Sequence, residues 1–227
     1  MSTLPPTPES LLLLAYEDLE GKSRVDSTTL KYAVAGAVLV DLAAVGRIDV
    51  VDGRVVVNDP TPTGTPYLDD PLTRIAAEHK QRKPKWWVEK LSGKSRQQVL
   101  DALVARGVLR RDERKVLGIF PADRYPGVVT GPEDAVRTRL RSVVLDGASA
   151  DESTAALVAV TRAAGMVKQL FPGLDPSERK AADARMREIS EGDWAGAAVK
   201  QALDEMYAAI SVAVVAASSG AAVAGSS

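Results

Sequence analysis

The chain has 227 residues, of which 45% are hydrophobic and 26% are charged, and its formal net charge is −1. This composition is that of an ordinary globular protein, and the charge disfavours a surface dedicated to nucleic acid. There is no cysteine and a single histidine, His79. Disulfides, thiol catalysis and a histidine-built metal site are therefore excluded, and the charged neighbours of His79 indicate a solvated surface residue.

Neither end of the chain is predicted to cross a membrane. The apolar run 11–16 is followed at once by Glu17 and Asp18, which is not the pattern of a signal peptide. The apolar stretch 206–217 is too short to span a bilayer, which takes about twenty helical residues, so we expect a buried core helix there. We expect flexible segments over 1–10 and 219–227, one folded domain over 11–218, and a cytoplasmic protein.

Two segments share the pattern of a helix followed by a β-hairpin. Each apolar helical stripe ends at a glycine, Gly46 or Gly107, and glycine is favoured just past a helix end because it enters the left-handed region without a steric penalty. After Gly46, apolar residues flank Asp52-Gly53, a two-residue hairpin signal. After Gly107, the pattern predicts a charged turn over 110–114 and an apolar strand over 116–120. Each unit is predicted to be a helix with a β-wing.

The other segments are predicted to be mostly helical. The proline-rich stretch 59–71 predicts a loop, and a second loop is expected over 121–132. Helices are predicted over 72–79, 86–91, 134–145, 154–170 with Ser153 as N-cap, 177–189 after Pro176, and from Trp194 through 200–217. The late helices are rich in alanine, which is typical of the centre of a bundle. The predicted fold class is mainly α, a single helical domain with short β-hairpins.

Basic residues gather in two places. The run 80–87 interleaves cations with two tryptophans, as at nucleic-acid and membrane surfaces, but also as in a solvated loop with one tryptophan in the core. In the second place, Lys94 and Arg96 begin the helix before the second wing, where N–H groups and the helix dipole favour an anion. Scattered surface charges explain this cluster equally well. Its other members are Lys90, Arg106, Arg110, Arg111, Arg114 and Lys115.

The second wing carries large apolar side chains directly after its cations. If one face of the strand is exposed, each side chain inserted in lipid contributes about 1.5–3 kcal/mol, and each nearby cation adds about 1 kcal/mol at an anionic leaflet. Leu117, Ile119 and Phe120 are therefore candidates for membrane insertion. Arg96 and Lys94 are the candidates for binding the headgroup.

No catalytic constellation stands out in the sequence. It lacks a Gly-rich phosphate loop, an H-E-x-x-H helix, a G-x-S-x-G elbow and a dinucleotide fingerprint. The paired carboxylates are expected at helix starts or on polar faces, where they cap helices; they are Asp69-Asp70, Asp151-Glu152 and Asp204-Glu205. We therefore predict that the chain is not an enzyme and uses neither a cofactor nor a metal.

Six segments, in order along nearly the whole chain, resemble the Golgi phosphoprotein 3 family in its bacterial form. They are ESLLLLAYEDLEG at 9–21, AGAVLVDLAAVGRI at 35–48, PTGTPYLDD at 62–70, WVEKLSG at 87–93, LVARGVL at 103–109, and the final helix around 206–217. The resemblance implies a mainly α-helical peripheral membrane protein that binds phosphatidylinositol 4-phosphate in a basic pocket and inserts an apolar hairpin beside it. It also implies that eukaryotic members hold glycosyltransferase tails at the Golgi.

Carried onto this chain, the resemblance makes 110–120 the inserting hairpin. One pocket arginine of the family falls on Arg96, and another falls at or beside Gly93, where Lys94 is a loose substitute. The pocket tryptophan falls on Asp26 and a further arginine on Ala35. An aspartate facing the bound phosphate would repel it, so weak or altered lipid selectivity is expected.

The leading prediction is a non-enzymatic adaptor on the cytoplasmic face of a membrane that binds anionic phospholipids. A client membrane protein and a second copy of the chain stay open as further partners. Two alternatives are a winged-helix protein that binds nucleic acid through its basic wing, which the net charge disfavours, and a protein–protein adaptor without a lipid ligand. In the latter, the apolar wing is the interface.

Overall fold

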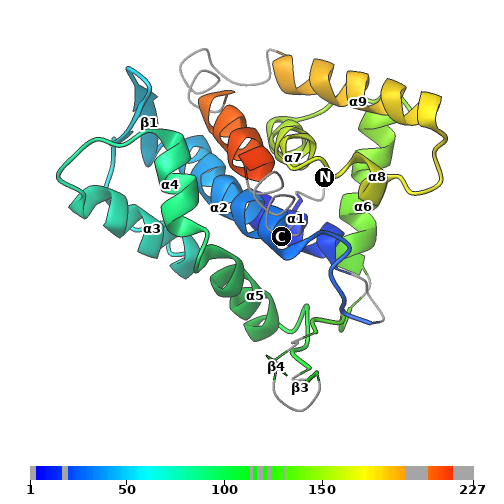
Figure 1. Ribbon diagram of the computed structural model, residues 1–227, viewed down its shortest axis with the longest axis horizontal. Helices are drawn as coiled ribbons and strands as arrows, with labels where there is room; N and C mark the ends of the chain where they lie inside the picture. Colours follow the sequence, from blue (N-terminus) through cyan, green and yellow to red (C-terminus); the bar gives the residue numbers. More distant parts are fainter. Residues whose placement is uncertain are drawn as a thin grey trace, which may run out of the picture.

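The computed structural model describes residues 4–16, 20–112, 115–116, 120–121, 124–129, 131–192 and 204–216. They form a helical domain with two small antiparallel hairpins (Figure 1). The helices are α1 (Thr7–Ala15), α2 (Ser27–Ala44), α3 (Pro66–Ala77), α4 (Pro84–Leu91), α5 (Ser95–Ala105), α6 (Gly131–Val144), α7 (Glu152–Ala163), α8 (Val167–Leu170) and α9 (Pro176–Glu191), with a further helix over 204–216. The strands are β1 (Ile48–Val51), β2 (Arg54–Val57), β3 (Lys115–Val116) and β4 (Phe120–Pro121). The predicted fold class is confirmed.

The core is built around α1 and α2, which lie against each other at the centre of the molecule (Figure 1). Every residue of α1 is buried, and the helix begins at Thr7, inside the segment 1–10 for which we expected flexibility. By length and composition α2 could cross a membrane, but 67% of its apolar window is buried. Because α1, α3, α4, α5 and α7 all contact it, α2 is accounted for as the core helix.

A buried carboxylate joins three helices. Glu9 of α1 is 1% exposed and accepts a hydrogen bond from the hydroxyl of Tyr67 in α3 at 2.8 Å. It also forms an ion pair with the guanidinium of Arg106, at the end of α5. An unpaired charge in the interior is very costly, so these two partners allow Glu9 to lie there.

The start of α1 is capped from a neighbouring helix. No side chain of its own segment caps α1. Instead, the carboxylate of Asp41 in α2 accepts a hydrogen bond at 3.1 Å from the N–H of Thr7, the first helical residue. Burial raises the pKa of Asp41 to about 6. This contact fixes the position of α1 along α2.

The helix over 204–216 crosses α2 at a glycine. A Cβ on Gly36 would lie 2.1 Å from a side-chain atom of Ile210, so a larger residue at position 36 would collide with it. Met206, Ile210 and Ala213 are buried, which confirms a core helix for the described part of 206–217. The predicted helix start at Trp194 lies outside the described residues.

The first hairpin forms as predicted. β1 and β2 pair antiparallel, with Ile48 opposite Val57 and Val51 opposite Arg54. The two residues between the strands, Asp52 and Gly53, have φ of 51° and 69°, the positive values that a tight hairpin turn requires.

The second hairpin is longer than predicted. Its two arms keep one register, from Leu109 opposite Gly127 through Asp112 opposite Arg124 to Val116 opposite Phe120. The predicted turn over 110–114 is therefore wrong, because Arg110 and Asp112 donate backbone hydrogen bonds across the hairpin to residues 126 and 124. Val116 is paired with Phe120, so the expected single strand over 116–120 is wrong.

Two further boundaries differ from prediction. α3 begins at Pro66 within the expected loop 59–71, because proline fits the first helical position, where its missing N–H is not needed. The carboxylate of Asp69 also accepts hydrogen bonds from the N–H groups of Thr63 at 2.6 Å and Gly64 at 3.2 Å, which holds the preceding loop on the first turn.

The expected helix over 154–170 is two helices, α7 and α8. They are separated at Gly165, whose φ of 68° ends the first. Asp151, not Ser153, is the N-cap of α7, and its carboxylate accepts from the N–H of Thr154 at 2.9 Å. The other predicted helices are present within a few residues of the expected bounds.

The buried carboxylate gives a test of the fold. Replacing Arg106 by alanine leaves the buried carboxyl group of Glu9 without its cation, which should lower the free energy of unfolding by about 3 kcal/mol. Urea denaturation measures this loss. Arg187→Ala on α9, an exposed arginine, is the matched control and should change stability by less than about 0.5 kcal/mol. Equal small losses for both variants would show that the ion pair with Glu9 does not stabilise the fold.

Candidate functional site

Arg96 lies where the end of α1, the start of α2 and the start of α5 meet. Its Nε donates a hydrogen bond to the hydroxyl oxygen of Tyr16 at 3.1 Å, and its Nη2 donates a hydrogen bond to the same oxygen. Its Nη1 donates a hydrogen bond to Oγ of Ser27 at 3.0 Å. The guanidinium carbon lies 5.7 Å from the centre of the Tyr16 ring. Within the described part of the chain, no carboxylate forms an ion pair with Arg96, so its charge remains available to an anion.

Two buried tyrosines connect Arg96 to the second hairpin. The rings of Tyr16 and Tyr125 are 5.5 Å apart and meet edge to face at 72°. The N–H of Tyr125 donates to the carbonyl of Gly21 at 3.0 Å. Gly21 has a φ of 60°, and a Cβ there would lie 2.3 Å from the backbone nitrogen of Pro126. Because this position is glycine, the backbone at Tyr125 and Pro126 can pack directly against Gly21, which places the base of the hairpin beside Arg96.

The cluster offers several groups to an anion. Burial raises the pKa of Tyr16, while Arg96 opposes the shift, so the Tyr16 hydroxyl stays neutral and can donate its proton. No side chain forms a capping hydrogen bond at the start of α5. A helix start of this kind favours negative charge. A guanidinium, a hydroxyl and a helix dipole thus lie together at one place.

Asp26, whose carboxylate we expect to face a bound phosphate, is the N-cap of α2. Its carboxylate accepts hydrogen bonds from the N–H groups of Thr28 at 3.0 Å and Thr29 at 2.8 Å. Burial raises the pKa of Asp26, but the hydrogen bonds from Thr29 and Thr28 outweigh it, so the net shift is downward. The carboxylate is ionised at neutral pH and lies next to Ser27, a partner of Arg96.

Ala35, where the resemblance places an arginine, is fully buried in α2. It therefore supplies neither a cation nor exposed surface to a headgroup site in this chain.

Some cations of the predicted second basic cluster form ion pairs in the structure, whereas others do not. Arg106 pairs with the buried Glu9. Arg110 lies 2.7 Å from Asp112, whose hydrogen bond raises the pKa of Arg110, and Arg111 lies 3.9 Å from Asp101. These three cations are already matched with acids, whereas Arg96 is not.

Lys94 and Arg96 are not part of one contact network. Lys94 is exposed at the N-cap position of α5, and within the described residues its side chain makes no hydrogen bond or ion pair. The insertion candidates Leu117 and Ile119 lie outside the described residues, and Phe120 is described only through its backbone in β4. The residues that sequence reasoning missed are Tyr16, Ser27 and Tyr125, which only the folded chain brings to Arg96.

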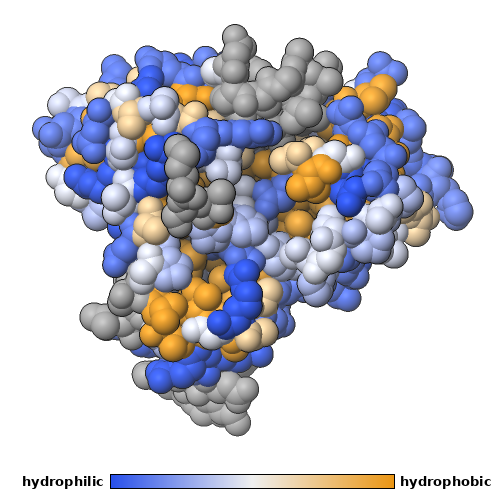
Figure 2. All heavy atoms as spheres, turned by 180° about the vertical axis from the view of Figure 1, so that it is seen from behind, coloured by the Kyte–Doolittle hydropathy of each residue, from blue (hydrophilic) through white to orange (hydrophobic). Residues whose placement is uncertain are grey.

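The hairpin end of the molecule also exposes apolar surface. Val128 and Val129, which follow the last paired residue of the hairpin, are 57% and 48% exposed. Figure 2 shows further apolar surface on the face of the molecule opposite to that of Figure 1. Exposed apolar surface of this kind is a common feature of sites that contact a membrane.

Comparison with known proteins shows a family relationship over most of the chain. The sequence profile of the family described as Golgi phosphoprotein 3 (GPP34) matches residues 8–206. Vacuolar protein sorting-associated protein 74 of Eremothecium gossypii is 28% identical over 161 residues, which are 60% of this chain and 48% of that protein. The protein of the same name in Schizosaccharomyces pombe is 23% identical over 219 residues, 80% of this chain and 64% of that protein.

The chain thus spans between about half and two thirds of the length of these curated relatives. Because the family profile covers nearly all of the folded part, the chain belongs to the Golgi phosphoprotein 3 family.

Proposed function

We propose that this chain is a peripheral membrane protein on the cytoplasmic face of a membrane. We propose further that it binds anionic phospholipid headgroups at the cluster formed by Arg96, Tyr16 and Ser27. Members of its family are non-enzymatic adaptors, and we propose the same role here. The lipid indicated by the family is phosphatidylinositol 4-phosphate. A client membrane protein as partner and a bacterial source remain predictions from the resemblance.

The observation that carries this proposal is the linkage of Arg96 to the second hairpin. Tyr16 accepts hydrogen bonds from Arg96 and packs on Tyr125, which lies in the hairpin. Arg96 is thus linked to the base of the second hairpin, and the sequence of this hairpin carries Leu117, Ile119 and Phe120. Such an arrangement can bind a headgroup while apolar side chains enter the lipid next to it.

The lipid preference is proposed to be altered relative to the family pattern. Position 26 carries an ionised carboxylate in place of a tryptophan, and position 35 carries a buried alanine in place of an arginine. One cation fewer and one anion more near the site weaken the attraction for a multiply charged phosphate.

We first expect that binding to vesicles depends on anionic lipid and on Arg96. Flotation with vesicles that contain phosphatidylinositol 4-phosphate should weaken as salt rises, because exposed charges are screened beyond about 8 Å at physiological ionic strength. Arg96→Ala should weaken binding about tenfold, whereas Arg187→Ala on α9 should not. Salt-independent binding to neutral and anionic vesicles alike would contradict the proposal.

Insertion of the hairpin can be tested with a single label, because the chain has no cysteine. Gly118→Cys, labelled with an environment-sensitive dye, should shift its emission to the blue on anionic vesicles. Replacing Leu117, Ile119 and Phe120 together by serine should weaken binding by at least about a hundredfold, since each inserted side chain contributes about 1.5–3 kcal/mol. The control variant replaces Val51, Val212 and Val215 by serine, because these valines are exposed on parts of the surface outside the second hairpin. Equal losses in both triple variants would exclude insertion.

The carboxylate of Asp26 offers a separate test of charge near the site. Asp26→Ser keeps an N-cap oxygen, so the free energy of unfolding should change by less than about 0.5 kcal/mol. Removing the negative charge should tighten binding to anionic vesicles about threefold. Asp26→Ala should bind as tightly but lose about 1 kcal/mol of stability with the cap. If Asp26→Ser binds no more tightly than the parent chain, the carboxylate does not oppose the headgroup.

A further inference from the structure

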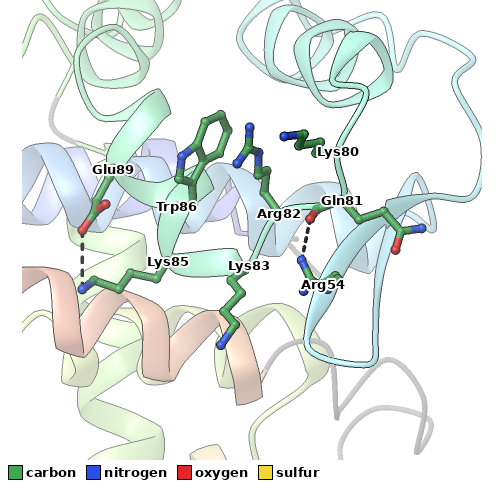
Figure 3. A pocket seen from close by; sticks show the side chains of 8 residues that line it. All are labelled: Arg54, Lys80, Gln81, Arg82, Lys83, Lys85, Trp86 and Glu89. Carbon is green, nitrogen blue, oxygen red and sulfur yellow. Dashed lines mark hydrogen bonds and ion pairs between the residues drawn. The ribbon is translucent and has the colours of Figure 1, made fainter.

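A second concentration of positive charge surrounds a pocket at the start of α4 (Figure 3). The pocket has a volume of about 410 Å³ and lies between β2 and the segment that joins α3 to α4. Five cations line it: Arg54, Lys80, Arg82, Lys83 and Lys85. The only carboxylate among its lining residues is that of Glu89. The proposed headgroup site does not use any of these residues.

The pocket is held in shape by contacts of which only one is an ion pair, that of Arg82 with Glu78. Arg54 donates from Nη1 to the carbonyl of Gln81 at 2.8 Å, and the N–H of Val55 donates to the carbonyl of Arg82 at 2.8 Å. The guanidinium of Arg82 lies 4.7 Å from the centre of the Trp86 ring and 3.3 Å from the carboxylate of Glu78. The loop is thus fixed to β2, and the cations are positioned before any ligand arrives.

Three of the five cations lack an acidic partner. In the described part of the chain, Arg54, Lys80 and Lys83 form no ion pair, while Lys85 has only the exposed Glu89 at 3.7 Å. Figure 3 shows the side chains of Arg54, Lys83 and Lys85 reaching to one side of the loop, and those of Lys80 and Arg82 to the other. In a chain with a net charge of −1, this local excess repels itself, and a bound anion relieves the repulsion.

The first turn of α4 adds to the attraction for an anion. The N-cap position is occupied by Lys83, whose side chain caps no N–H group, so the start of the helix presents partial positive charge at the pocket. Aromatic stacking of a ligand is not available there, because the Trp86 ring is already flanked by Arg82 and by Lys90 at 5.8 Å. Charge and hydrogen bonding, rather than a ring, are what this pocket can recognise.

We propose that this pocket is a second anion site, which binds a phosphate monoester or diphosphate between β2 and the start of α4. Arginine and lysine side chains are the usual ligands of phosphate oxygens, and the volume is ample for two phosphate groups. α4 has eight residues and is therefore about 12 Å long, and α5 starts shortly after it. Two phosphates, one at each end of α4, could be bound at the same time. The phosphate can belong to a lipid headgroup or to a soluble ester.

The test uses the full chain with Arg96→Ala, so that the first site does not contribute. Isothermal titration calorimetry with inorganic pyrophosphate at low salt compares this parent with the variant that also carries Arg54→Ala and Lys83→Ala. Both side chains are exposed. A second variant, Lys80→Ala with Lys83→Ala, leaves the Arg54 contact with Gln81 in place. The control adds Lys180→Ala and Arg187→Ala on α9, which removes the same charge from another exposed surface.

We expect both pocket variants to bind pyrophosphate about tenfold more weakly than the parent, and the α9 control to bind as the parent does. Flotation with vesicles that contain phosphatidic acid then identifies the source: a parallel loss means a lipid phosphate, and unchanged vesicle binding means a soluble ester. The proposal is overturned if the parent binds no pyrophosphate, or if the pocket variants and the control lose equally. Neither result bears on the Arg96 site, which is tested in the chain with Arg96 present.

Discussion

The carboxylate of Glu9 constrains the arrangement of the helices around it. It lies in α1, whose residues are all buried, and it requires both the hydroxyl of Tyr67 from α3 and the guanidinium of Arg106 from α5. Because a charge without partners is not tolerated in an apolar core, α3 and α5 must approach α1 at fixed positions. The start of α5, one helix length from Arg106, is thereby placed beside the end of α1. This is how a buried ion pair determines where Arg96 meets Tyr16.

The candidate headgroup site is assembled at the ends of helices rather than along their faces. Arg96 starts α5, Tyr16 ends α1 and Ser27 starts α2. Helix ends carry unpaired backbone groups and the partial charges of the helix dipole, so they suit an ionic ligand. The second hairpin is tied to the same place through Gly21 and Tyr125. The proposed headgroup site therefore lies beside the base of this hairpin.

A net charge near zero conceals how unevenly the charges are distributed. In the described part of the chain, most arginines form ion pairs with acids, as Arg106, Arg110 and Arg111 do. These arginines contribute little attraction for an anion. Among the described cations without an ion pair are Arg96 and three that line the pocket before α4, Arg54, Lys80 and Lys83. Because a phosphate responds to local potential and not to the total charge, a slightly acidic protein can still present two surfaces suited to anions.

The sequence by itself determined the fold class, the first hairpin and most helices, because these depend on local chemistry: apolar periodicity, Asp52-Gly53, and the glycines after α2 and α5. It also pointed to Arg96 through its place at a helix start and through the resemblance. Only the tertiary structure decided which cations are free, since Arg106 is neutralised by Glu9, 97 residues away. The same holds for Asp26, whose carboxylate turns to its own helix, and for the second hairpin. In that hairpin, backbone pairing that begins at Leu109 and Gly127 continues through the charged segment that the local sequence predicted to be a turn.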